Sequence, residues 1–331
     1  MNSKSIFFAL ITLLIYLNTH AQMNRLEKAK DLYEKDKYDL ALAMVNEVIG
    51  EQPTNYKAYL LKAGIYFYLK KMDQREACLV KALKLAPYQP EVYQEYGGFL
   101  KGNQRNDEAL RLYKQGIERI PNNAELHYMA GNVYDKQKKL PEALHYFEQA
   151  VNLEPTNPHY CYRKGSVLHA MGQLSEALKV LNQSIVLHAK GQKKNKYGYS
   201  DKSYSIFYSA RASVKDDLKD YQGALADYQE AFRLNPNEFT EYRLERFKSN
   251  VAYQYYSEFE ELKEKDVAKA REFAQKALKW ATKEDDDIRE DIKEFEEEQT
   301  DKQQIAEVRK AQSEIQTLVT AKKYQQALPL A

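Results

Sequence analysis

The chain has 331 residues, of which 30% are charged and 44% hydrophobic, and its net charge is only +2. So balanced a charge provides no overall electrostatic attraction to nucleic acid or to an anionic membrane surface. The 12 glycines and 9 prolines are few for this length, which disfavours turn-rich β architectures and disorder.

Residues 1–21 have the pattern of a secretory signal peptide. Lys4 precedes an apolar run over residues 6–17, which is too short to span a bilayer comfortably, and small residues then precede a cleavage point at Gln22. We therefore expect a bacterial protein that is exported through the secretory pathway and resides in the periplasm, at the cell surface or in the medium. The alternative is an uncleaved membrane anchor, and the mature N-terminus distinguishes the two.

Residues 22–236 contain a pattern that repeats every 34 residues. Prolines recur at this interval, and at fixed distances before each proline there are two small residues and one bulky residue. The prolines are Pro53, Pro87, Pro121 and Pro155. The small residues 24 positions earlier are Ala29, Ala63, Gly97 and Gly131, and Gly165 continues the series. The second small position is interrupted only by Arg75.

Each copy of the pattern predicts two helices with a break between them, because its apolar residues recur at i, i+3 or i+4 and i+7. Gly172 can end the first helix of the fifth copy in the left-handed conformation. Asp39 and Ser175 are candidate caps of second helices. Asn157 is another candidate cap, and Pro141 and Pro158 suit a first helical turn.

A helix–turn–helix of 34 residues with these small, bulky and proline positions resembles the tetratricopeptide repeat. The resemblance covers six units over residues 22–236, and it departs at Arg75, at Ala189 and in an insertion near 189–203. It implies an all-α solenoid, in which stacked hairpins form a right-handed superhelix with a concave groove. The small residues allow close helix crossings, so we expect a larger residue at Gly131 to overpack the core.

The last third of the chain is more divergent. Residues 237–283 resemble a stretched seventh repeat, and residues 284–331 predict a charged helix and the start of a further repeat. A chain that ends inside a repeat would be the front part of a longer protein. The lysines of the insertion near 189–203 either form a solvated loop or bind an anionic surface.

The sequence has no pattern that indicates catalysis or a cofactor. It lacks a glycine-rich phosphate loop and the Gly-x-Ser-x-Gly, His-Glu-x-x-His and Cys-x-x-Cys motifs. His159 and His169 would be about 15 Å apart along one helix, too far to share a metal ion. Cys78 and Cys161 fall in non-adjacent repeats, so we expect two buried thiols and no disulfide. We therefore expect no enzyme activity, no metal, no cofactor and no small-molecule substrate.

The resemblance implies where a partner would bind, because in this family one stripe of each first helix lines the groove. The corresponding residues here are Lys57, Leu60, Phe67, Gln94, Lys101, Tyr128, Asn132, Asp135, His159, Tyr162 and His169. Some relatives hold a peptide's terminal carboxylate with lysine and asparagine on successive first helices. Asn132 is in place here, but Tyr128 replaces the lysine, so that clamp is incomplete.

These observations predict a non-enzymatic, exported scaffold that binds a protein or peptide in the groove of repeats two to five. Such a scaffold would support assembly of an envelope or secreted complex. The alternative is the repeat-containing N-terminal part of a larger exported enzyme or envelope-anchored protein. Neither interpretation involves nucleic acid.

Overall fold

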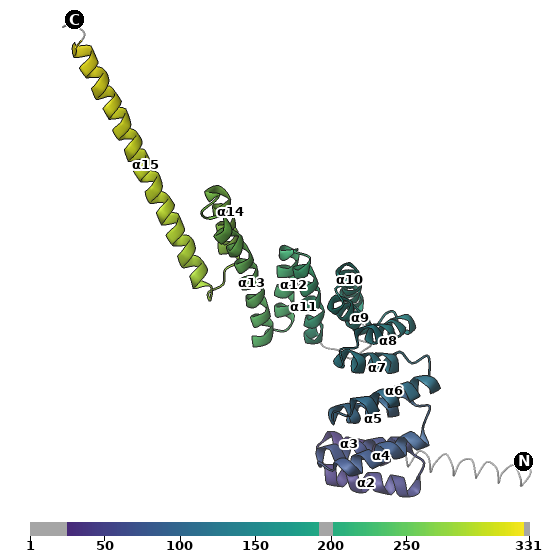
Figure 1. Cartoon of the computed structure of the whole chain (residues 1–331). Coiled ribbons are helices and arrows are strands. Elements are labelled where there is room, and N and C mark those ends of the chain that lie inside the picture. The colour runs from purple at the N-terminus through teal and green to yellow at the C-terminus, as the bar shows by residue number, and fades with distance from the viewer. Residues whose placement is uncertain (1–24, 192–200, 328–331) are drawn as a thin grey trace, which may run out of the picture. The chain divides into compact units, whose positions relative to one another are not determined.

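The computed structural model describes residues 25–191 and 201–327, and every regular element within these ranges is a helix (Figure 1). Contacts between the helices divide the chain into two units, residues 1–194 and 195–331, which are described separately below. The expected signal peptide and most of the lysine-rich insertion lie outside the described residues. Within the described ranges, no helix combines the length and apolar character needed to cross a membrane.

The first unit is a row of helix–turn–helix hairpins (Figure 1). A helix over residues 25–34 shares a buried core with α2 through Ala29, Ala41 and Val45, and the later helices pair in chain order. Their bounds are α2 (Tyr38–Glu51), α3 (Tyr56–Tyr68), α4 (Met72–Leu85), α5 (Pro90–Gly102), α6 (Asn106–Arg119), α7 (Ala124–Lys136), α8 (Leu140–Leu153), α9 (Pro158–Ala170) and α10 (Leu174–Gly191). These hairpins coincide with the first five predicted repeats.

The second unit begins with the sixth hairpin and continues into the divergent region. Its helices are α11 (Asp201–Asp217), α12 (Tyr221–Leu234), α13 (Glu238–Leu262), α14 (Val267–Trp280) and α15 (Asp286–Ala327). Helices α13 and α14 form the stretched seventh hairpin. Helix α15 is continuous over 42 residues, so the separate second helix expected near the end of the chain does not form within the described residues.

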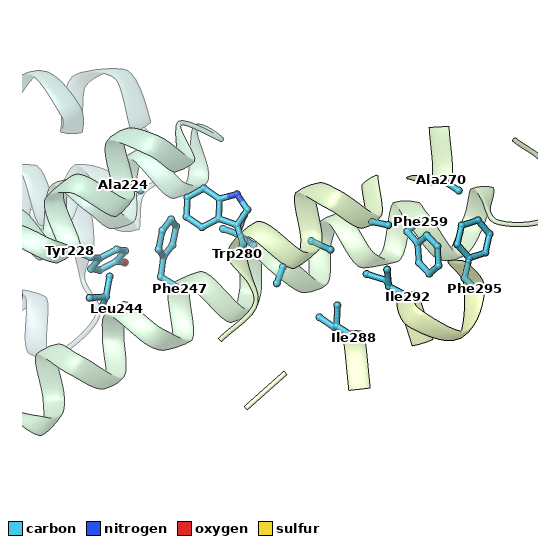
Figure 2. Close-up of a cluster of buried hydrophobic side chains, with 14 of the residues drawn as sticks. Ala224, Tyr228, Leu244, Phe247, Phe259, Ala270, Trp280, Ile288, Ile292 and Phe295 are labelled. Carbon is cyan, nitrogen blue, oxygen red and sulfur yellow. The ribbon is translucent and has the colours of Figure 1, made fainter. Parts of the chain in front are cut away.

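Aromatic and aliphatic side chains join α12, α13, α14 and the start of α15 into one core. Phe247 lies between Tyr228 and Trp280, with ring centroids 5.0 and 5.7 Å away (Figure 2). Phe259 meets Phe295 of α15 edge to face at 5.1 Å. Ile288, Ile292 and Phe295 recur at helical spacing and are all buried, whereas every residue from 300 to 314 is exposed. Only the first turns of α15 therefore belong to this core.

The turn inside each of the first six hairpins is built around one residue in the left-handed conformation. Gly172 has φ +75°, which confirms its predicted role after α9. The other turns use residues that are not glycine, at positions that largely keep the 34-residue period: Asp36, Lys70, Gln104, Lys138 and Lys219. The left-handed turn therefore recurs at the same position of the repeat even where that residue is not glycine. The left-handed backbone costs each of these residues about 1 kcal/mol, and the packing of the hairpin offsets this cost.

The predicted helix starts were right for the prolines and for the cap at Asn157, whose side chain accepts a hydrogen bond from the backbone of His159, and wrong for two other caps. Pro141 and Pro158 lie in first helical turns, as expected. Asp39 and Ser175 do not cap their helices, because α2 already begins at Tyr38 and α10 begins at Leu174. Both residues therefore lie inside the first turn, where an acidic side chain such as Asp39 interacts favourably with the helix dipole.

The small residues of the repeat face bulky side chains of the second helix, as the pattern predicted. A Cβ atom added at Gly97 would lie 2.2 Å from the Tyr113 ring, and one added at Gly131 would lie 2.8 Å from the Phe147 ring. Real side chains cannot approach so closely, so only glycine fits these crossings. Cys78 and Cys161 are buried free thiols, which also agrees with the prediction.

Candidate peptide-binding groove

The predicted binding residues lie on the first helices of the hairpins in the first unit. Lys57, Leu60 and Phe67 are on α3, and Gln94 and Lys101 are on α5. Helix α7 carries Tyr128, Asn132 and Asp135, and α9 carries His159, Tyr162 and His169. The structure gathers most of these residues at two places, an open cleft near the N-terminus and a polar cluster on α5, α7 and α9.

The N-terminal cleft is an open hollow of about 470 Å³ between the helix over 25–34, α3 and α5. Its lining residues are Leu26, Glu27, Lys30, Tyr33, Lys57, Leu60, Leu61, Gly64, Glu91 and Glu95. Leucine and tyrosine side chains supply its apolar surface, and charged side chains from all three helices surround them. Lys57 and Leu60 were predicted from the sequence, whereas the contribution of the first helix was not.

Phe67 belongs to an exposed aromatic patch at the end of α3. Its ring meets Tyr68 edge to face at 5.2 Å, and Tyr68 stacks on Tyr38 at 4.8 Å. The guanidinium of Arg75 lies over the rings of Phe67 and Phe99, at 4.7 and 5.3 Å from their centroids. The arginine that interrupts the small-residue row of the repeat therefore holds two aromatic rings through cation–π contacts.

The polar cluster brings together side chains from three successive first helices. The Tyr128 ring packs 5.1 Å from Tyr160 and 5.9 Å from Phe147, and its hydroxyl hydrogen-bonds with Asn132. Burial raises the pKa of Tyr128, so the hydroxyl stays neutral at physiological pH. The hydroxyl of Tyr160 donates a hydrogen bond to Glu125 at 2.8 Å. Tyr128 is thus partly a packing residue, with its polar end in the cluster.

The same cluster contains both positively and negatively charged side chains. Arg163 of α9 donates a hydrogen bond to Asp135 of α7 at 2.7 Å, which links two hairpins. Lys101 of α5 is partly buried, and burial together with the nearby Lys136 and Arg163 lowers its pKa. Glu125 opposes this effect on Lys101. The cluster can therefore offer a hydrogen-bond donor, an acceptor, a cation and an aromatic surface to a peptide.

The histidines predicted on α9 differ in their surroundings. His159 is only 8% exposed, so its side chain offers a partner little surface. Burial and the nearby His188 of α10 lower the pKa of His159 to about 4, which keeps it neutral. His169, Tyr162 and Gln94 are partly exposed.

Sequence reasoning missed several residues of these two sites, including Arg163, Tyr160 and Tyr33. Arg163 and Tyr160 are adjacent to predicted positions but lie off the expected stripe, and they reach the cluster because their side chains are long. Tyr33 lies on the first helix, which the groove prediction did not include. Among the described residues, no three histidine, cysteine or carboxylate side chains are placed to hold a metal ion.

A row of hairpins with small residues at the crossings and a cleft along the first helices defines a helical-repeat solenoid. The repeats are tetratricopeptide repeats, because family models of that description match residues 56–89, 124–157, 158–187 and 207–238. The matched segments follow the hairpins described above.

Comparison with individual proteins gives partial similarities. Hsp70-Hsp90 organizing protein 2 of Arabidopsis thaliana is 30% identical over 100 residues, which are 30% of this chain and 18% of that protein. Protein adenylyltransferase Fic of Drosophila melanogaster is 36% identical over 107 residues, 31% of this chain and 21% of that protein. The chain thus spans about a fifth of the length of these relatives.

The solved structure of Pseudomonas aeruginosa pilF is similar in fold. It superposes with a TM-score of 0.54 over 70% of this chain and 98% of that one, at 17% sequence identity. The all-α tetratricopeptide-repeat solenoid predicted from the sequence is therefore confirmed.

Proposed function

We propose that this protein is an exported, non-enzymatic scaffold that binds an extended segment of a protein partner along the first helices of its first five hairpins. The observation that carries the proposal is the arrangement of the N-terminal cleft and the polar cluster on successive first helices. Scaffolds of this kind recognise a peptide through hydrogen bonds to its backbone and through aromatic and charged contacts to its side chains. The relative from Arabidopsis thaliana is named for organizing Hsp70 and Hsp90.

Export is supported by the sequence pattern of residues 1–21, and the envelope or the extracellular space is the proposed site of action. N-terminal sequencing of the protein purified from its native host tests this point. We expect the mature chain to begin at Gln22 and to be absent from the cytoplasm. An intact N-terminus in a cytoplasmic fraction would contradict export.

The groove is tested with a variant that removes polar groups and preserves packing. Tyr128→Phe retains the ring against its neighbours, and it is combined with Asn132→Ala and Tyr162→Ala. The matched control changes exposed residues away from the first helices, Tyr88→Ala and Gln115→Ala. The partner is identified by cross-linking and mass spectrometry in the native host, purified, and titrated against each variant by calorimetry.

We expect the groove variant to bind the purified partner at least about tenfold more weakly, because several interface contacts are lost together. The control should bind as the wild type does, and both variants should retain the wild-type circular dichroism spectrum. Unchanged affinity of a folded groove variant would show that the partner does not use this surface.

A second candidate is the repeat-containing N-terminal part of a larger exported enzyme or envelope-anchored protein. The similarity to a Fic adenylyltransferase favours it, because the match covers 31% of this chain and only 21% of that enzyme. The coding frame downstream of Ala331 distinguishes the two candidates. A continuation into a catalytic or membrane-anchoring domain supports the second candidate, and an immediate stop codon supports the scaffold.

A further inference from the structure

The N-terminal cleft has a chemical character that narrows the kind of segment it can bind. Its apolar surface comes from Leu26, Leu60, Leu61 and the ring of Tyr33. Gly64 of α3 belongs to the lining, and the Tyr33 side chain lies over it, because a Cβ atom at Gly64 would be 3.4 Å from the Tyr33 hydroxyl. A longer side chain at position 64 would therefore push the Tyr33 ring into the hollow. With a volume of about 470 Å³, the hollow has room for a large apolar side chain from outside.

One wall of the cleft is anionic. Glu91 and Glu95 are one turn apart on α5, so their carboxylates lie on the same side of the helix. Both are exposed. Glu95 interacts electrostatically with the guanidinium of Arg75, and of the two lysines in the lining Lys30 is already within 3.9 Å of Glu34. This leaves the carboxylates of Glu27 and Glu91 against the single ammonium group of Lys57, so the cleft complements a positive charge.

We propose that the N-terminal cleft binds a partner segment in which a large aliphatic or aromatic residue lies beside a lysine or arginine. The apolar side chain enters beside Leu60 and the ring of Tyr33, and the cationic side chain faces the wall formed by α5, chiefly Glu91. This inference rests on the proposed function, because it names the chemistry of the segment that the scaffold recognises. The polar cluster on α5, α7 and α9 then contacts a different part of the same partner.

The test measures binding of the full chain to an array of immobilised seven-residue peptides. The central residue of each peptide is leucine, phenylalanine or serine, and its neighbours are lysine, serine or glutamate. We expect peptides with leucine or phenylalanine flanked by lysine to retain the most protein. Non-specific attraction does not predict this preference, because the chain itself carries a net charge of +2. Equal retention on serine-centred or glutamate-flanked peptides would overturn the proposal, as would no retention on any peptide.

Two variants and their matched controls locate the binding. Gly64→Leu fills the cleft, and Gly98→Leu is its control, because Gly98 occupies the same position in the next repeat and has no atom within 4 Å of an added Cβ. Leucine favours helix at both positions, so neither change should unfold the chain. Gly64→Leu should weaken peptide binding by about tenfold or more, the value of one buried leucine side chain, and Gly98→Leu should not.

The second variant, Glu91→Gln with Glu95→Gln, should abolish the preference for lysine over serine next to the apolar residue. Its control is Glu118→Gln, at an exposed carboxylate on α6. Equal effects of a variant and its control would place the peptide elsewhere. If the cleft variants and their controls bind the peptides equally, the scaffold function can still be tested separately. The natural partner is then titrated against the variant of Tyr128, Asn132 and Tyr162.

Discussion

Two adjacent glycines on α5 provide a direct test of how the hairpins pack. A Cβ atom at Gly97 would lie 2.2 Å from Cε1 and 2.3 Å from Cζ of Tyr113, a side chain that is only 1% exposed. These distances are more than 1 Å shorter than the optimum of about 3.5 Å for carbon atoms. At Gly98 an added Cβ would meet no atom within 4 Å. The same substitution at neighbouring positions should therefore have opposite effects.

We expect Gly98→Ala to stabilise the protein by up to about 1 kcal/mol, because alanine is the better helix former. Gly97→Ala gains the same propensity but overpacks the crossing of α5 and α6, which costs about 1–3 kcal/mol or more. Because the propensity gain is common to both variants, their stabilities should differ by the overpacking cost, about 1–3 kcal/mol or more in favour of Gly98→Ala. Urea unfolding followed by circular dichroism measures this difference, and equal midpoints would refute the proposed crossing geometry.

A second substitution tests whether the Tyr113 ring causes the destabilisation by Gly97→Ala. The second hairpin has Ala63 where the third has Gly97, and Leu79 where the third has Tyr113. The double variant Gly97→Ala with Tyr113→Leu therefore recreates a pair that this fold already contains. We expect Gly97→Ala to cost at least about 1 kcal/mol less in the Tyr113→Leu background. The same cost in both backgrounds would show that another contact causes the destabilisation.

Two further predictions concern buried ionisable groups. The pKa of His159 is lowered to about 4 from 6.5, so its contribution to stability is complete above pH 6.5 and is lost as the pH falls toward 4. We expect His159→Phe to flatten the loss of thermal stability over this range, and an unchanged pH profile would contradict the assigned burial. Asp227 is 3% exposed and pairs with Arg211 at 2.6 Å and Lys215 at 2.9 Å. Asp227→Asn should cost about 3 kcal/mol by leaving these charges poorly compensated, and a thermal midpoint within experimental error of the wild type would show that the network is dispensable.

The hairpins were predictable because their determinants are local and repeated. Gly131 and Phe147, or Gly165 and Leu181, are sixteen residues apart in each pair and meet within one hairpin. A contact that recurs at a fixed separation along the chain produces a periodic pattern of residue types in the sequence. The pattern was right for the cap at Asn157 and wrong at Asp39 and Ser175, which have the chemistry of a cap but lie inside the first turn of the helix. Boundaries depend on backbone geometry that composition alone does not define.

The groove was only partly predictable, since its contacts join different hairpins. Arg163 reaches Asp135, and Tyr160 reaches Glu125, across 28 and 35 residues of chain. These pairs depend on side-chain length and on the angle between neighbouring hairpins, neither of which the repeat pattern specifies. His159 shows the same limit, because it was predicted on the groove stripe and is nevertheless buried near His188.

The sequence by itself determined the class of fold, the number and register of the matched hairpins and the residues that hold each crossing together. It could do so because every hairpin buries its apolar face against its own partner helix and its sequence neighbours. Only the tertiary structure showed that Gly64, Tyr33 and the carboxylates of α5 form one cleft. A hollow is the space left between side chains of several helices, and its shape and charge depend on all of them at once.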